Sequence, residues 1–273
     1  MPIFVFKIAV AICVVYALTV ALGYFAQRKL MYFPIPERVA PSEVGLSGVE
    51  ERIIQTPDGE RVVAWYGRAQ PGQPTILYFH GNGGNLALRA ERIRRYLDRG
   101  QGILMMSYRG YSGSTGSPTE AANVADARLA YDLLVNEGVV PEDVILYGES
   151  LGTAVAARIA AERPVGGLIL DSPFTSAVDV GARHYPFFPV RLLMQDRYEV
   201  LPYVAKIQTP LLVIHGERDE IVPVDMGRQV YAAANSPKKL VTFPLAGHND
   251  HALHGSFEAI QAWIAQLRAG EEQ

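Results

Sequence analysis

Five short, almost wholly apolar runs recur along this chain, and they constrain its fold more than any other feature of the sequence. Each run is four to six residues long, and helix-like or turn-like sequence separates it from the next. Short runs of this kind are typical of parallel strands that are buried on both faces of a sheet. The runs are Thr75–His80, Gly102–Ser107, Val144–Tyr147, Gly167–Leu170 and Leu211–Ile214.

Helical periodicity fills the gaps between these runs. Ser117 and Glu120 have the spacing of a capping box, and apolar residues follow on one face of the helix that they would begin. The stretch Leu151–Arg163 is almost wholly apolar and predicts a buried helix, while Phe257–Leu267 has the pattern of an amphipathic final helix. Alternating strands and helices predict an α/β fold with a mainly parallel central sheet and helices on both faces.

The N-terminal segment stands apart because Ile8–Phe25 carries no charge. At about 1.5 Å per residue, a helix of this length reaches roughly 27 Å, close to the thickness of the hydrocarbon core of a bilayer. The polar residues Gln27, Arg28 and Lys29 end the run abruptly. We therefore expect a single transmembrane helix that anchors the protein in a membrane.

Two other interpretations of this segment stay open. A cleaved signal peptide would have a shorter apolar core, although Ala21-Leu22-Gly23 is a passable cleavage site. A buried core helix is seldom this long and this uniformly apolar. Arg28, Lys29 and Arg38 on one side of the segment outnumber Lys7 on the other, so the positive-inside rule leans towards a globular domain on the cytoplasmic side.

These features divide the chain into an anchor at residues 1–27, a linker at 28–47 and an α/β domain at 48–270. The linker carries three prolines between Phe33 and Val44 and shows little periodicity, as expected of a segment that lies on the surface. Because this linker intervenes, we expect the α/β domain to fold and work without the first 27 residues.

Composition excludes several classes of function. The chain has 25 Lys and Arg residues against 28 Asp and Glu, a formal net charge of −3, which leaves no broad basic surface for nucleic acid. A single cysteine, Cys13, excludes an internal disulfide framework and a thiolate zinc site. His248, His251 and His254 recur every three residues, but no H-E-x-x-H pattern supports a metal site. We expect neither a metal nor another cofactor.

The pentapeptide Gly148-Glu149-Ser150-Leu151-Gly152 fits the pattern G-x-S-x-G. The physics of this pattern requires a strand that enters a very sharp turn and opens into a helix, so that the serine hydroxyl is exposed. An apolar strand-like run precedes it and the predicted buried helix follows it. Ser150 is therefore a candidate nucleophile, although a tight turn without chemistry would give the same pattern.

A glycine-rich segment, His80–Asn85, follows the first of the five runs. Such a loop can present backbone N–H groups to a developing oxyanion, together with the N–H of Leu151, the residue after the candidate nucleophile. We expect Asn82 to be the second donor, with Gly83 as the alternative. A phosphate-binding loop fits poorly because the sequence lacks G-x-x-x-x-G-K-[ST]. His80 is expected to be structural.

A serine nucleophile needs a base, and the base needs an acid that orients it. His248 follows a strand-like segment late in the chain and is the candidate base. Asp219 lies just beyond the run Leu211–Ile214 and is the candidate acid. Asp171 also follows a strand and competes for this role. The order Ser, Asp, His is the one found in hydrolases that are built around this elbow.

The sequence resembles the α/β-hydrolase superfamily, and within it the membrane-anchored branch that includes the bud-emergence-type proteins. The resemblance implies an α/β-hydrolase fold, with Ser150 as nucleophile, Asp219 as acid and His248 as base. It further implies an oxyanion hole formed by the Asn82 region and Leu151. Related members act on esters, thioesters, lipids and peptides, so the substrate is not specified. The segments that carry the resemblance are Tyr32–Pro34, His80–Asn85, Tyr108–Ser114, Gly148–Gly152, Asp171–Ser176, His215–Asp219 and Gly247–Asn249.

The stretch between Asp171 and Leu211 is too long for a tight connection and predicts a small cap at about 172–208. Its apolar residues Phe187, Phe188 and Met194 are candidates for an acyl pocket. The expected partner is a small-molecule or lipid acyl substrate, and the expected reaction is hydrolysis of a carboxylic ester or thioester.

Two other functions remain as alternatives. A serine peptidase or aminopeptidase of the same fold would need an acidic subsite for the substrate amine, for which Glu149 and Glu217 are the available carboxylates. A non-catalytic binding module would share the fold but would not use the serine.

Overall fold

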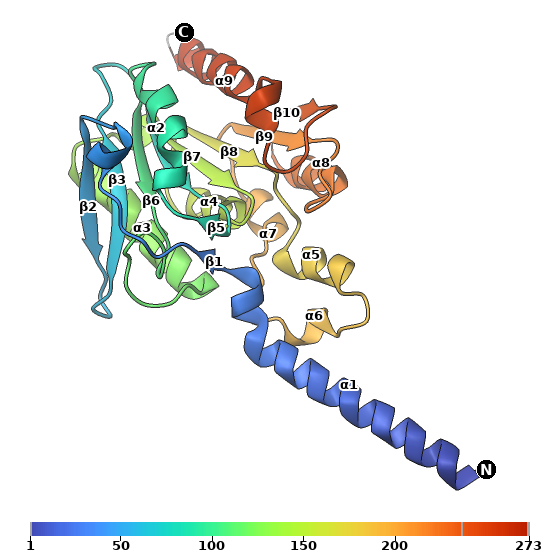
Figure 1. The fold of residues 1–273 in the computed structure, drawn as a ribbon. Coiled ribbons are helices and arrows are strands. Elements are labelled where there is room, and N and C mark those ends of the chain that lie inside the picture. Colours follow the sequence, from blue (N-terminus) through green and yellow to red (C-terminus); the bar gives the residue numbers. More distant parts are fainter. Residues whose placement is uncertain (1, 236, 272–273) are drawn as a thin grey trace.

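The computed structural model describes residues 2–235 and 237–271, and within them one large twisted sheet dominates (Figure 1). The sheet has eight strands in the order β10-β9-β8-β7-β4-β6-β3-β2. The six strands from β10 to β6 are parallel, whereas β3 runs antiparallel to β6 and β2 antiparallel to β3. The strands are β2 (Val49–Gln55), β3 (Arg61–Gly67), β4 (Thr75–Phe79), β6 (Gly102–Met106), β7 (Val144–Glu149), β8 (Gly167–Asp171), β9 (Leu211–Gly216) and β10 (Lys238–Phe243).

Helices cover both faces of this sheet, as the alternating pattern predicts. Successive residues of β4 point to opposite faces, since Leu77 belongs to one buried apolar cluster and Ile76 to the other. The first cluster includes residues of α3 (Glu120–Asn136), α4 (Gly152–Ala160) and α8 (Val224–Ala233). The second includes residues of α2 (Ala90–Leu97) and α9 (Ser256–Glu271). The predicted α/β-hydrolase fold with its mainly parallel central sheet is confirmed.

The start of α3 differs from the predicted capping box. The N-cap is Thr119, whose Oγ1 accepts a hydrogen bond from the N–H of Ala122 at 3.0 Å, and not Ser117. Tertiary contacts occupy the residue that the box requires: the Glu120 N–H donates to Asp196, and the Glu120 carboxylate accepts from the N–H of Arg197. The helix therefore begins two residues later than the box would place it.

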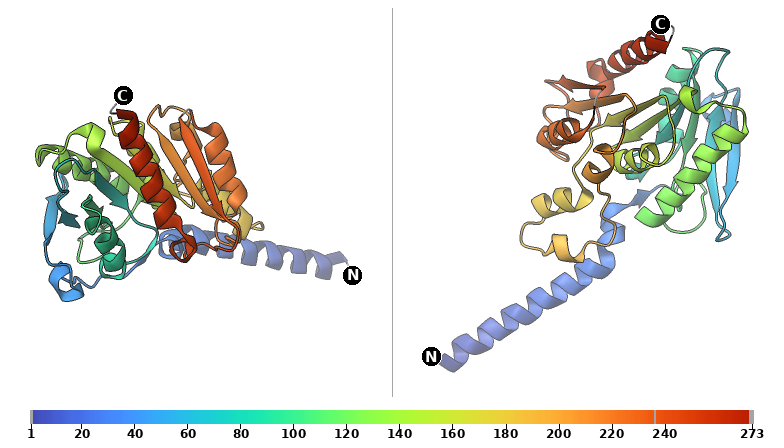
Figure 2. Two further views of the ribbon diagram at one scale, coloured as in Figure 1. Left: turned by 90° about the horizontal axis from the view of Figure 1, so that it is seen from above. Right: turned by 180° about the vertical axis from the view of Figure 1, so that it is seen from behind.

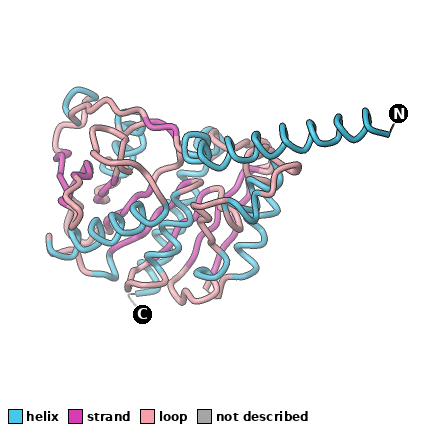
Figure 3. The backbone as a smooth tube through the Cα atoms, turned by 90° about the horizontal axis from the view of Figure 1, so that it is seen from below, coloured by secondary structure: helices cyan, strands magenta, loops and turns pink. Residues whose placement is uncertain are grey.

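A long apolar helix, α1 (Pro2–Met31), leaves the body of the molecule and projects away from it (Figures 1–3). Its residues Ile3–Met31 form the one helix among the described residues that is long and apolar enough to cross a membrane, a test that a signal sequence also passes. The helix continues four residues beyond Gln27, the predicted end of the anchor.

The segment after α1, predicted as a linker on the surface, also makes specific contacts with the body of the molecule. The short strand β1 (Phe33–Pro34) pairs in parallel with β5 (Gly83–Gly84), which lies in the glycine-rich loop. Tyr32 is buried, and its hydroxyl contacts Asp196 and Tyr198. A short 3₁₀ helix at Pro41–Val44 follows before β2 begins. This segment connects the helix directly to the loop beside the candidate nucleophile.

Three short helices lie between β8 and β9, where a cap is predicted: α5 (Ala177–His184), α6 (Val190–Leu193) and α7 (Leu201–Val204). Helices α5 and α6 lie beside the C-terminal half of α1, at the edge of the sheet where the parallel strands end (Figures 1 and 2). We refer to residues 172–208 as the cap. Both the cap and α1 therefore lie over the end of the molecule that carries the candidate site.

Candidate active site

Ser150 lies at the sharp turn between β7 and α4. Its φ of 49° is in the left-handed region, which costs a non-glycine residue about 1–3 kcal/mol and persists only where the surrounding structure enforces it. Two glycines allow the turn to close. A Cβ atom at Gly148 would lie 2.4 Å from the carbonyl oxygen of Gly152, and one at Gly152 would lie 2.1 Å from the carbonyl oxygen of Phe79. The G-x-S-x-G pattern thus forms the strained strand–turn–helix that it predicts.

Ser150, His248 and Asp219 lie together at the carboxyl edge of the sheet. The Ser150 Oγ is 3.0 Å from the Nε2 of His248, and the Nδ1 of His248 is 2.6 Å from the Oδ2 of Asp219. Each residue follows a different parallel strand: β7, β10 and β9, respectively. Because Nδ1 faces a carboxylate, it carries the ring proton and donates, which leaves Nε2 free to accept from the serine hydroxyl.

The Asp219 carboxylate is held by several donors. Its Oδ1 accepts from the backbone N–H groups of Ile221 and Val222 at 2.9 and 2.7 Å, and the Nε2 of His215 is 3.3 Å from Oδ2. Burial alone would raise the pKa of Asp219, but hydrogen bonds from His215, His248 and Val222 outweigh it and lower the pKa. The carboxylate therefore stays ionised over the physiological range.

The ionised Asp219 in turn sets the charge state of His248. Burial lowers the pKa of this histidine, but the hydrogen bond and the negative charge of Asp219 have the larger combined effect, so the pKa is raised above its ordinary value of 6.5. An imidazole with a raised pKa is a stronger proton acceptor, as a general base requires.

The glycine-rich loop lies directly beside Ser150. A Cβ atom at Gly81 would be 3.6 Å from the Cβ of Ser150. The next residue, Asn82, is fixed by its side-chain Nδ2, which donates to the carbonyl of Met31 at 2.8 Å. Its own carbonyl accepts from the Phe33 N–H at 2.9 Å and from the Tyr111 hydroxyl at 2.7 Å. With its side chain and carbonyl engaged, Asn82 has its backbone N–H left to offer to the cavity.

His80 is structural, as expected. It is fully buried, its Nδ1 donates to the carbonyl of Gly81 at 2.6 Å, and its Nε2 accepts from the N–H of Tyr108 at 3.3 Å. Burial, helped by the charge of Arg89, lowers the pKa of His80 to about 3. A neutral ring with one donor and one acceptor holds the start of the glycine-rich loop.

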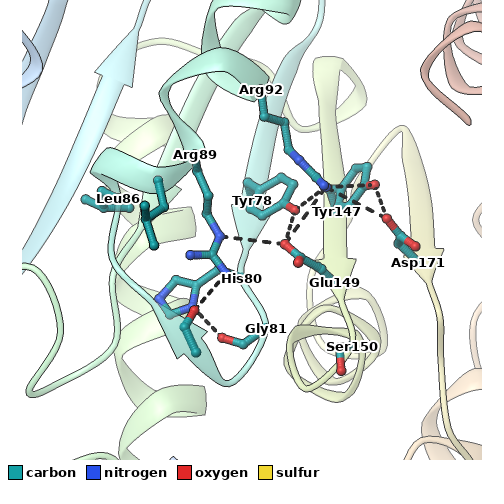
Figure 4. A network of polar contacts seen from close by, with 12 residues as sticks. Tyr78, His80, Gly81, Leu86, Arg89, Arg92, Tyr147, Glu149, Ser150 and Asp171 are labelled. Carbon is teal, nitrogen blue, oxygen red and sulfur yellow. Dashed lines mark hydrogen bonds and ion pairs between the residues drawn. The ribbon is translucent and has the colours of Figure 1, made fainter. Parts of the chain in front are cut away.

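A network of charged and phenolic groups, which the sequence analysis did not predict, lies next to Ser150 around the side chain of Glu149 (Figure 4). The Tyr78 hydroxyl donates to the Oε2 of Glu149 at 2.5 Å. Arg89 and Arg92 lie 3.7 and 3.9 Å from the same oxygen. Burial raises the pKa of Glu149, but Arg92 and Arg89 outweigh it and lower the pKa to about 2. We call this set, together with Tyr147 and Asp171, the buried network.

Asp171, the competing candidate acid, belongs to the buried network. It accepts from the Tyr147 hydroxyl at 2.6 Å, and its Oδ2 lies 3.8 Å from Arg92. Its other oxygen, Oδ1, lies 3.3 Å from the Nδ1 of His251. Asp171 thus contacts His251, whereas the candidate base is His248. The geometry therefore joins Asp219, and not Asp171, to the serine and the histidine.

The remaining candidate residues are occupied elsewhere. The carboxylate of Glu217 lies 3.3 Å from Arg228 and accepts from the hydroxyl of Thr242. His251 contacts Ser172 at 3.2 Å, and His254 lies 3.8 Å from Asp250. Within residues 2–235 and 237–271, no group of three or more His, Cys, Asp or Glu side chains has an arrangement that could hold a metal ion. The three histidines of the repeat, His248, His251 and His254, thus contact different partners and do not form one site.

A large, mostly apolar cavity of about 1100 Å³ opens above Ser150 and His248. One wall is formed by the cap, including Phe188 and Met194, and the opposite wall by α1. Phe187, which the sequence predicts as a pocket residue, is 85% exposed and is not part of the lining. That prediction is wrong because the cap turns at this point and directs the neighbouring Phe188 inward instead.

Helix α1 takes part in this cavity. Nine of its residues between Thr19 and Met31 line the same cavity as Ser150. The expectation that the domain folds and turns over short esters without the first 27 residues stays a prediction, although these residues supply part of one cavity wall.

Comparison with known proteins agrees with this architecture. Residues 74–197 match the family described as alpha/beta hydrolase fold. The chain is 40% identical to an uncharacterized protein of Mycobacterium tuberculosis over 83% of its own length and 82% of the relative's. It is 31% identical to the alpha/beta hydrolase domain-containing protein WAV2 of Arabidopsis thaliana, over 86% and 85% of the two chains. It is also 32% identical to the protein bem46 of Schizosaccharomyces pombe, over 90% and 89%.

Among solved structures, the fold is similar to that of an esterase from Pyrococcus furiosus. The TM-score is 0.68 at 20% sequence identity, over 86% of this chain and 97% of the esterase. At this level of identity, the likeness concerns the fold.

Proposed function

Because the chain belongs to the α/β-hydrolase family, we propose that it is a serine hydrolase that cleaves carboxylic esters through an acyl-enzyme. The observation that carries the proposal is the continuous line of hydrogen bonds from Ser150 through His248 to Asp219. A nucleophile, a base and an orienting acid within hydrogen-bonding reach form the arrangement that acyl transfer to serine requires.

In the proposed reaction, the Oγ of Ser150 attacks the ester carbonyl carbon while Nε2 of His248 takes the hydroxyl proton. The tetrahedral intermediate collapses, the bond to the alcohol oxygen breaks, and His248 returns the proton to the departing alcohol. Water then attacks the acyl-enzyme with the same base, releasing the carboxylic acid and restoring Ser150. Asp219 stays ionised throughout and stabilises the imidazolium.

The developing oxyanion would be bound by the backbone N–H groups of Leu151 and Asn82. Leu151 is buried directly after Ser150 and, like Asn82, borders the cavity. Among the described residues, neither N–H is engaged by another backbone or side-chain group outside the regular elements. Such a donor is worth about 3–4 kcal/mol in the transition state.

The cavity favours an acyl group over a substrate amine. Its exposed surface is mainly apolar, and the two carboxylates that an aminopeptidase subsite would need are already paired: Glu149 with Arg89 and Arg92, and Glu217 with Arg228. A carboxylate that is neutralised by arginine has little charge left for an ammonium group. The proposed substrate is therefore an ester or thioester with an apolar acyl chain.

We further propose that α1 is retained in the mature protein as a membrane anchor. Its last turns pack on the cap, and its following strand pairs with the loop beside Ser150, contacts that a cleaved signal peptide would not make. Recovery of the protein from the soluble fraction without its first residues, by mass spectrometry, would contradict this.

The test of the reaction is covalent labelling by a fluorophosphonate probe. The purified full-length protein should be labelled once, and Ser150→Ala should not be labelled. A panel of p-nitrophenyl esters, thioesters and aminoacyl amides then ranks the substrates, with esters or thioesters expected to exceed amides. An unlabelled wild-type protein, or equal labelling of Ser150→Ala, would refute the proposal.

A further inference from the structure

The wall of the cavity formed by α1 is a regular stripe on one face of the helix. The partly buried residues between positions 20 and 31 recur every three or four positions, as expected of a helix face that lies against a neighbour. They are Val20, Gly23, Ala26, Gln27 and Met31. Between them, Ala21 and Phe25 point away from the body and are exposed. The stripe faces the cap and, with it, encloses the upper part of the cavity.

The end of this helix is held in place by polar contacts with the cap. The Gln27 Oε1 accepts from the N–H of Gln195 at 2.8 Å. Arg28 contacts both oxygens of the buried Asp196, at 2.9 and 3.3 Å. These contacts fix the width of the groove between α1 and the cap, so the groove is a built feature of the structure.

Three of the polar side chains along the groove are already engaged. The Thr19 hydroxyl donates to the carbonyl of Val15 at 2.8 Å, and the Nε2 of His184 donates to the carbonyl of Ile221 at 2.9 Å. The Gln27 amide donates to the carbonyls of Tyr24 and Leu193. A ligand in this groove therefore meets mostly apolar surface until it reaches Ser150, which suits a hydrocarbon chain.

The groove opens where the tip of the cap, which includes Phe187 and Leu192, lies beside α1. The Tyr16 hydroxyl donates to the carbonyl of Phe187 at 2.8 Å. The hydrocarbon core of a bilayer takes about 20 helical residues. Whether these begin near Pro2 or at Ile8, Tyr16 lies within them. The cap tip would then lie at the level of the lipid, which accounts for its strongly exposed apolar residues Phe187 and Leu192.

We propose that the groove between α1 and the cap is the subsite for a single long acyl chain of a lipid ester, which enters sideways from the bilayer with its carbonyl end towards Ser150. The anchor helix is then part of the substrate site as well as a tether. This inference rests on the proposed hydrolase function and adds the substrate class and the route of entry.

Gly23 gives the test its sharpest position. A Cβ atom there would lie 3.8 Å from the Cε1 of Phe188, an ordinary contact, so the helix tolerates a side chain while the rest of a leucine would occupy the groove. Ala21, two residues earlier, is exposed and is not part of the lining. The pair Gly23→Leu and Ala21→Leu therefore places the same side chain inside or outside the groove.

The experiment uses the full-length protein in phosphatidylcholine vesicles with 4-methylumbelliferyl palmitate and acetate. Each buried methylene raises kcat/KM by about threefold to fourfold, so blocking the space of a few methylenes should lower the palmitate-to-acetate ratio of Gly23→Leu at least tenfold. Ala21→Leu should keep this ratio within about twofold of wild type. An unchanged ratio in Gly23→Leu would overturn the proposal.

A second measurement separates this subsite from the proposed chemistry. Ser150→Ala is irradiated in the same vesicles with a diazirine-bearing palmitic acid, and the cross-linked residues are mapped by mass spectrometry. Cross-links should fall on the stripe and on Phe188 or Met194, and adding Gly23→Leu should remove them. Cross-links confined to outward residues such as Phe25 would overturn the subsite. Should no ester be hydrolysed while the groove is labelled, the hydrolase proposal fails and the subsite stands.

Discussion

The two ends of the cavity are held together by different kinds of contact. At its floor, Ser150, His248 and Asp219 follow three strands of one rigid sheet and are joined by hydrogen bonds of 2.6 and 3.0 Å. At its roof, α1 and the cap meet mainly through apolar side chains, with polar contacts at Tyr16 and near the C-terminal end of α1.

From this difference we expect the floor to determine the rate of the reaction and the roof to determine the preference among substrates. In the proposed reaction, groups at the floor touch the reacting atoms of any ester, so a change there should alter turnover of all substrates in proportion. Residues at the roof would contact only the distant part of a long acyl chain. A change at the roof should alter the ratio between substrates, through binding energy that short esters do not use.

The largest effect is expected at the floor. Ser150→Ala and His248→Ala should each lower kcat for p-nitrophenyl esters by about 10⁶-fold, because nucleophile and base act as one unit. The double variant should be hardly slower than either single one. Clearly additive losses in steady-state assays would mean that the two residues do not work together.

The second prediction compares Asp219, which follows β9, with Asp171, the last residue of the neighbouring strand β8. Asp219→Asn should lower kcat by about 10⁴-fold, because the amide favours the wrong tautomer of His248. Asp171→Asn should keep near-normal turnover per folded molecule. It should lower the free energy of unfolding by about 1–3 kcal/mol, since a charged partner of the buried network is lost. Stopped assays and thermal unfolding measure the two effects. The reverse outcome would move the acid role to Asp171.

A third prediction concerns the contact between Arg28 of α1 and Asp196 of the cap, at the roof of the cavity. Arg28→Ala leaves the buried Asp196 with the Tyr32 hydroxyl and the Glu120 N–H as donors, and should cost about 1–2 kcal/mol of stability. Lys29→Ala, at the exposed neighbour, should stay within about 0.5 kcal/mol of wild type. Thermal unfolding in detergent micelles compares the pair. Equal midpoints would show that the helix end is not held by this contact.

The smallest expected effect is a shift on the pH axis. Protonated His248 cannot accept the proton of Ser150, so kcat/KM should fall as the pH drops through the pKa of His248. This pKa is raised by Asp219, so the acid limb should lie above the ordinary histidine value of 6.5. In Asp219→Asn the residual activity should show its acid limb at lower pH. An unshifted limb in that variant would mean that Asp219 does not set the charge state of the base.

The sequence predicts the floor far better than the roof. Apolar runs, a strained serine turn and the order Ser, Asp, His are local patterns, and local patterns determine which residues end neighbouring strands. They bring Ser150, Asp219 and His248 to one edge without further information. The sequence already favours Asp219 over Asp171 as the acid, but it does not show what Asp171 does, because its partners Tyr147 and Arg92 lie far from it along the chain.

The roof was not predictable because it joins segments that are distant in sequence. Composition identifies Ile8–Phe25 as apolar, but an apolar helix can face lipid on all sides. Its contact with the cap depends on small residues such as Gly23, and on Arg28 meeting Asp196, 168 positions later. The inward turn of Phe188, in place of Phe187, depends on the same packing.

The short pairing of β1 with β5 connects the proposed membrane helix to the floor of the cavity. Asn82 receives the N–H of Phe33 at its carbonyl and donates to Met31, the last residue of α1. A thinner or thicker bilayer changes the tilt of a spanning helix. Only one residue separates the end of α1 from β1, and β1 is hydrogen-bonded to Asn82. A change in the tilt of α1 would therefore move the glycine-rich loop that contains Asn82. If α1 spans the bilayer as proposed, the thickness of the surrounding membrane is a physical input to the geometry next to Ser150.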